Sequence, residues 1–135
     1  MSVTDTTVGF SVDVPLAYEE ADVRTRELLK AAGFGVLTEI DVRATMREKL
    51  DVDFPRYEIL GACNPPLAYR ALQAEPGVGL LLPCNVVVAE REEGGTRVSF
   101  MDPMTILALV DNPALDVIAA DVAERLRRVA AALNG

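Results

Sequence analysis

The sequence predicts an α/β fold, a two-layer sandwich in which a mixed sheet of roughly five strands has its helices packed mainly on one face. Two segments, residues 16–32 and 115–133, carry apolar side chains at steps of three or four, as helices with one buried face do. The short apolar runs between them are typical of strands. A helix with a single apolar stripe needs a sheet face to cover. The length of 135 residues fits a single domain, residues 1–135, with its core in about residues 8–133.

The first half of the chain predicts two strands and two helices. Residues 8–14 alternate between apolar and other side chains, which indicates a half-buried strand. The first helix ends at Gly33, because glycine adopts the conformation in which helices commonly end. Residues 34–42 form the second predicted strand. Thr45 and Glu48 have the spacing of a capping box, so a short helix is expected to begin there.

The middle of the chain predicts two further strands joined by a helix. Residues 56–62 form one strand, and Pro65 precedes a helix over residues 67–74. Residues 84–90 form the next strand. Its valines at 86–88 are continuous rather than alternating, which predicts a central strand buried on both faces.

The last third predicts a hairpin and a long helix. The turn Glu93-Gly94-Gly95 leads into a returning strand over residues 96–101. A short helical piece over residues 102–110 follows, and Asn112-Pro113 begins the final helix. The apolar stripe of that helix consists of Leu115, Ile118, Val122, Leu126, Val129 and Leu133.

Alternation assigns several polar side chains to the second face of the sheet. They are Ser11, Asp13, Glu39, Asp41, Arg97 and Ser99. This face is too polar for a second core layer, so it is expected to be solvent-exposed, a ligand surface or a dimer interface.

Composition excludes several classes of function. The chain has no histidine, which excludes Ser-His-Asp and Cys-His catalysis and every His-ligated metal site. Lys and Arg number 13 against 21 Asp and Glu, a net charge of −8 that argues against nucleic-acid binding. The most apolar stretch, residues 77–89, is too short to span a membrane. Two cysteines are too few for a disulfide scaffold, so we expect a cytoplasmic protein with free thiols.

A repeated Cys-Asn dipeptide is the most unusual local feature. Cys63-Asn64 follows one predicted strand and Cys84-Asn85 begins another, each beside proline. One interpretation is a dithiol or soft-metal site with the asparagines orienting a ligand. The other is that both cysteines are small buried hydrophobic residues, their commonest role. Two thiolates without histidine do not complete a tetrahedral set, so no metal is expected.

The chain between the two dipeptides is short for a crossover between parallel strands. An antiparallel pair would bring the end of the first strand to the start of the second. We therefore expect the Cα atoms of Cys63 and Cys84 to lie within roughly 10 Å, with no requirement for disulfide geometry.

An acidic pair and a lysine are further charged candidates, with two possible interpretations for each. Glu39 and Asp41 share a predicted sheet face about 6–7 Å apart, close enough to hold a cation or to shift each other's pKa. Such a pair also commonly just faces solvent. Lys49 could pair with an anionic ligand or lie at a solvated helix end.

Five segments resemble the family called domain of unknown function 302. The segments are residues 33–42, 47–50, 57–65, 75–88 and 102–103, and the resemblance runs from about Phe10 to the last helix. It implies a small bacterial or archaeal α/β domain that is homodimeric and has no established activity or cofactor. The positions that match the motifs are candidate ligand-binding residues: Glu39, Lys49, Cys63, Asn64, Cys84, Asn85 and Asp102.

Three functions remain open from the sequence. The first is a small-molecule-binding domain with its site at the two Cys-Asn segments, at strand ends where α/β proteins commonly bind ligands. The second is a thiol-dependent redox or sulfur-handling enzyme, which requires a partly exposed cysteine with a lowered pKa. The third is a structural or interaction module that uses the open sheet face. Whether the protein is an enzyme stays undecided at this point.

Overall fold

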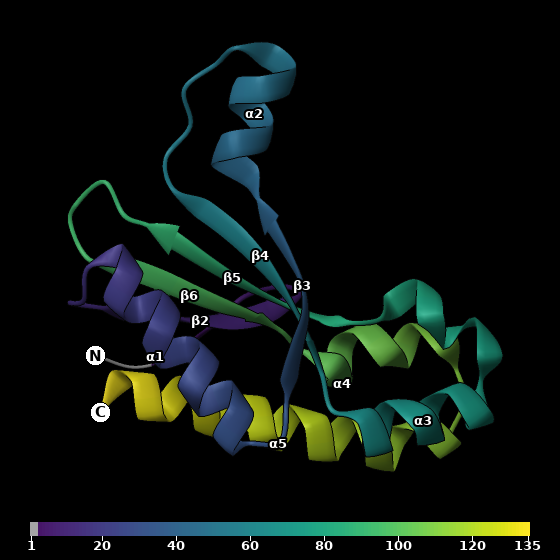
Figure 1. Ribbon diagram of the computed structural model, residues 1–135. Coiled ribbons are helices and arrows are strands. Elements are labelled where there is room, and N and C mark those ends of the chain that lie inside the picture. Colours follow the sequence, from purple (N-terminus) through teal and green to yellow (C-terminus); the bar gives the residue numbers. More distant parts are fainter. Residues whose placement is uncertain (1–2) are drawn as a thin grey trace.

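One six-stranded antiparallel sheet forms the centre of the protein in a computed structural model that describes residues 3–135 (Figure 1). Its strand order is β1-β2-β6-β5-β4-β3. The strands are β1 (Thr4–Asp5), β2 (Gly9–Val14), β3 (Gly35–Asp41), β4 (Tyr57–Cys63), β5 (Cys84–Glu90) and β6 (Thr96–Met101). The helices are α1 (Tyr18–Ala31), α2 (Val42–Leu50), α3 (Pro65–Ala74), η1 (Pro76–Leu81), α4 (Pro103–Ile106), η2 (Leu107–Val110) and α5 (Ala114–Asn134).

The predicted α/β sandwich with helices mainly on one face is confirmed, with two differences in the sheet. It has six strands rather than five, because the short β1 pairs with the edge of β2. Every pairing is antiparallel, so the sheet is not mixed. The connection from β4 to β5 explains the second difference. Helix α3 lies beyond the end of the sheet in Figure 1, so the chain returns to the same end instead of crossing a face.

The core lies between the sheet and the helix pair α1 and α5. Helix α5 packs against α1, α3 and β2, and its predicted apolar stripe is buried along its whole length. The inward side chains of the central strands, Phe10, Leu60, Val86, Val98 and Phe100 among them, are at most 2 % exposed. Among residues 3–135, no helix is long and apolar enough to cross a lipid bilayer.

Strand β5 is central but is covered on one face only, which corrects the prediction of burial on both faces. Val86 and Val88 are fully buried against the helices, whereas Val87 between them is half-buried on the open face. None of the helices of residues 3–135 lies over that face (Figure 1). The valine run there continues into a partly apolar surface, because Val87 pairs with Ile59 of β4 and Ile59 with Ile40 of β3.

The polar side chains assigned to the open face are divided between the two faces. Ser11 and Asp13 pair in register with Ser99 and Arg97, on the open face as predicted. Glu39 and Asp41 instead pair with Leu60 and Glu58 on the helix side of the sheet. An irregularity between Val36 and Thr38 shifts the register of β3 by one residue, and such a bulge interrupts the alternation on which the assignment rested.

Helix α2 stands away from the sheet at the end of β3 (Figure 1). It begins three residues before the predicted capping box, because Asp41 rather than Thr45 caps it and accepts a hydrogen bond from the Ala44 amide at 2.9 Å. None of its residues is buried. The segment from Ile40 to Phe54 therefore forms an arm that projects from the compact part of the protein.

Candidate functional site: an apolar cavity at the end of the sheet

The two cysteines meet at one end of the sheet. Cys63 ends β4 and Cys84 begins β5, and the residue before Cys63, Ala62, pairs directly with Cys84. An opposed antiparallel pair has Cα atoms at most about 5.5 Å apart, and consecutive Cα atoms lie about 3.8 Å apart. The Cα atoms of Cys63 and Cys84 are thus within about 9 Å. The prediction that antiparallel pairing brings the two cysteines together is confirmed.

A cavity of about 290 Å³ opens beside the two cysteines. Its walls come from the strand ends and from helices α3 and α5. Apolar side chains make most of the lining, and they include Phe34, Leu67, Ala71, Leu82, Pro83, Pro103, Leu107, Ile118 and Val122. No charged side chain contributes to it. The cavity can therefore hold a neutral molecule without burying an unpaired charge.

Asn64 fixes one wall of this cavity. Its Oδ1 accepts a hydrogen bond from the Leu67 amide at 3.1 Å and so caps α3, and its Nδ2 donates to the Gly33 carbonyl at 3.1 Å. Gly33 has a φ of +93°, in the left-handed region that favours glycine. The asparagine thereby joins the end of α1 to the start of α3. These bonds fix the position of its side chain in the cavity wall.

Burial disfavours the thiolate form of both cysteines. Burial, and then the neighbouring Cys63, raise the pKa of Cys84 to about 11. Burial also raises the pKa of Cys63, which is only partly covered at the cavity wall. The thiolate is the reactive form of cysteine. The arrangement thus lacks the lowered pKa that a thiol-dependent enzyme requires.

The remaining predicted site residues lie outside the cavity lining. Asn85 is exposed on the open face, opposite Gly61. Asp102 caps α4 through a hydrogen bond from the Met104 amide and pairs with Arg127 at 3.4 Å, while its neighbour Pro103 lines the cavity. Lys49 lies on the α2 arm. Of the seven candidates, the structure places Cys63, Asn64 and Cys84 in the wall of the cavity.

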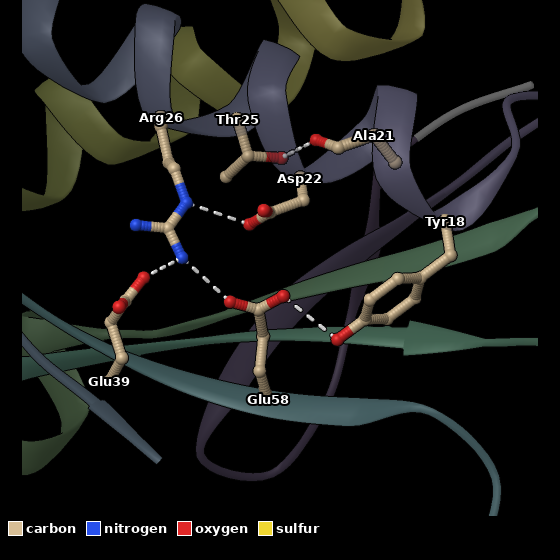
Figure 2. Close-up of polar contacts among 7 residues, drawn as sticks. All are labelled: Tyr18, Ala21, Asp22, Thr25, Arg26, Glu39 and Glu58. Atoms are coloured by element: carbon tan, nitrogen blue, oxygen red, sulfur yellow. Dashed lines mark hydrogen bonds and ion pairs between the residues drawn. The ribbon is translucent and has the colours of Figure 1, made fainter. Parts of the chain in front are cut away.

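Glu39 belongs to a separate cluster of polar side chains between α1 and the strands (Figure 2). Arg26 of α1 reaches down between Glu39 and Glu58 and forms an ion pair with each, at 2.8 Å for Glu58. Its Nε also donates to Asp22 at 2.8 Å, and the Tyr18 hydroxyl donates to the other Glu58 oxygen at 2.8 Å. Each of these polar groups has partners, so the cluster serves to tie α1 to β3 and β4.

Burial raises the pKa of Glu58, against the opposing effects of the Tyr18 hydroxyl and Arg26. The sequence analysis missed Glu58. A glutamate within an apolar strand indicates a buried polar contact, because glutamate is rarely buried without a partner. The sequence analysis also missed the cavity walls from α5, whose side chains are indistinguishable in sequence from ordinary core residues. No cluster of three or more metal-ligating side chains occurs in residues 3–135.

The family model for "Domain of unknown function DUF302" matches residues 10–133. The chain belongs to this family. A crystal structure of an uncharacterized conserved DUF302 protein from Bacillus stearothermophilus shares 35% sequence identity with it and superposes with a TM-score of 0.85. The match covers 93% of this chain and 98% of that chain. A search among curated proteins finds no match.

Membership in the DUF302 family confirms the resemblance found in the sequence and assigns no activity.

Proposed function

We propose that this DUF302 protein binds a small, neutral and largely hydrocarbon molecule in the cavity beside Cys63 and Cys84. The observation that carries the proposal is a cavity of about 290 Å³ without a charged side chain in its lining. Ligand sites are commonly concave, mostly apolar and about 300–1,000 Å³ in volume.

The exposed residues at the wall indicate how a ligand would enter. Leu37 of β3 is 65% exposed and Leu72 of α3 is 41% exposed, and both contribute to the cavity. Large apolar side chains left open beside a cavity favour an apolar ligand that continues to the surface. A polar end group of such a ligand would stay in water, because the interior offers it only the two thiols and the Asn64 amide as polar side chains.

Fluorescence titration with the neutral probe N-phenyl-1-naphthylamine tests this proposal. We expect saturable binding of one probe per chain, competed by 1-decanol. Replacing Ile118 by phenylalanine fills the cavity and should weaken probe binding about tenfold or more, the loss of about 1.4 kcal/mol. The matched control is Val117→Phe on the same helix, where the side chain is 76% exposed and lies outside the lining.

Equal probe binding by the Ile118→Phe and Val117→Phe variants would contradict the proposal. Because Ile118→Phe can perturb the core, Ala71→Leu on α3 provides a second way to fill the cavity from the opposite wall. Circular dichroism and thermal unfolding of each variant establish that the fold is kept.

The thiol-dependent alternative makes the opposite prediction for cysteine reactivity. With both pKa values raised, we expect the native protein to react with Ellman's reagent at neutral pH more slowly than free cysteine does. Cys84 should become reactive only on unfolding, because it is 7% exposed. A native thiol that reacts faster than free cysteine would instead support an enzyme.

We propose further that the chain forms a homodimer, as its family resemblance implies, and that it works in the cytoplasm. The arm around α2 supports the first proposal, because it projects without a buried residue of its own. The two free cysteines support the second, since reducing compartments maintain thiols. Sedimentation equilibrium tests the dimer, and cell fractionation tests the location.

A further inference from the structure

Helix α2 is a basic amphipathic helix with its apolar stripe incompletely covered. Val42, Met46 and Leu50 recur at every fourth residue and share one side of the helix. At 100° per residue, Lys49 lies on one flank of this stripe and Arg43 on the other. Among residues 3–135, neither has a carboxylate oxygen within 4.0 Å, although Arg43 lies close enough to Glu90 to help lower the pKa of that carboxyl. Leu50 is 65% exposed.

The rest of the arm continues the apolar surface. Ile40 is 49% exposed, Val52 43% and Phe54 38%. Helices shorter than about 12 residues are marginal in water without packing against other structure. Of the nine residues of α2, Val42 and Met46 are partly covered and none is fully buried within the chain. Packing of this incompletely covered stripe against a surface from outside its own chain would stabilise the arm.

The outer surface of α1 has the complementary character. An open groove there is lined by Leu16, Glu19, Glu20, Val23, Arg24 and Glu27. Val23 is 57% exposed, so the groove offers apolar contact. Glu19 already pairs with Arg56. Glu20 and Glu27 are exposed and have no ion-pair partner among the described residues, which leaves two carboxylates for a basic partner.

We propose that the α2 arm docks into the α1 groove of a second copy of this chain, and that the partner's arm does the same in return. This inference rests on the proposed homodimer and locates its interface. The charges favour a second copy, because α2 has three basic side chains and one acidic one in a chain of net charge −8. A two-fold axis makes both contacts identical.

Two competing modes of association fit the structure less well. Pairing through the exposed edge of β3 is opposed by the irregularity at Val36–Thr38 and by Glu39 and Asp41, features that protect sheet edges. An anionic membrane could attract a basic helix, but it would repel a chain of net charge −8.

Complementary charge reversals test the interface. One variant carries Arg43→Glu and Lys49→Glu on the arm, and the other carries Glu20→Lys and Glu27→Lys in the groove. Each variant alone places like charges in both contacts, whereas an equimolar mixture restores opposite charges in both. We expect sedimentation equilibrium to show dissociation constants raised about 100-fold for each variant alone and restored nearly to wild type on mixing.

The control reverses Glu92 and Glu93 to lysine at the β5–β6 turn and should leave the dimer intact. If both charge-reversal variants stay dimeric, or if their mixture stays monomeric, the proposed interface is wrong but the homodimer remains. A wild-type chain that is monomeric at the highest attainable concentration would overturn both. Binding of that monomer to phosphatidylserine vesicles would assign the arm to membranes instead. Circular dichroism of each variant confirms folding before the measurement.

Discussion

Replacing Asn64 by alanine is expected to destabilise the protein by about 2–3 kcal/mol and to weaken probe binding in the cavity. The substitution removes the cap of α3, which is typically worth 0.5–2 kcal/mol, and leaves the Gly33 carbonyl without this donor. Urea unfolding measures the first effect and probe titration the second. Both follow because the same side chain holds the start of α3 against the end of α1.

Replacing Asn64 by aspartate distinguishes the contributions of the two hydrogen bonds to stability. The aspartate retains an oxygen that accepts from the Leu67 amide but loses the amide donor to Gly33. We expect it to lose about half of the stability that alanine loses. If Asn64→Ala unfolds at the wild-type urea concentration, the asparagine does not support the cavity wall as described.

Replacing Gly61 by alanine is expected to cost about 1–3 kcal/mol and to displace a wall of the cavity. A Cβ atom at this position would meet the Thr38 hydroxyl and would lie 2.7 Å from Cγ of Pro83. Pro83 lines the cavity, so its displacement should change probe affinity as well as stability. Thermal unfolding and probe titration of the same variant measure the two effects.

Adding Thr38→Ala to Gly61→Ala tests which contact matters. The double variant removes the hydroxyl but leaves Pro83 in place, so we expect part of the stability to return while probe affinity stays reduced. Full recovery of both stability and probe affinity would mean that the contact with Pro83 does not affect the cavity. An unchanged stability in Gly61→Ala itself would contradict the close packing at this strand end.

Local sequence patterns predicted most helices and strands, because these elements depend mainly on residues that are close together in the sequence. The stripe of α5 was predicted from periodicity, the strand over residues 84–90 from its run of valines and the strand over residues 96–101 from the turn before it. The irregularity in β3 was not predictable in this way. It moves Glu39 to the helix side through a register that only pairing with β4 determines.

Of the candidate site, only the closeness of the two cysteines was predictable, from the short connection between β4 and β5. The short segment between Cys63 and Cys84 favoured antiparallel strands, which explains why the two cysteines were placed together. The cavity itself depends on side chains of α3 and α5 that come together from distant parts of the chain, including Leu67 and Ile118. Asn85 lies on the open face, away from the cavity, because one residue along a strand turns the side chain to the opposite face.

Intermolecular nuclear Overhauser effects between bound N-phenyl-1-naphthylamine and the methyl groups of the protein test the central claim most directly. The proposed function predicts strong effects to Leu67, Ile118 and Val122 in the cavity wall. Effects confined to exposed side chains such as Val117 and Leu80, with none to Ile118 or Val122, would show that the probe adheres to the surface and would contradict a binding site beside Cys63 and Cys84.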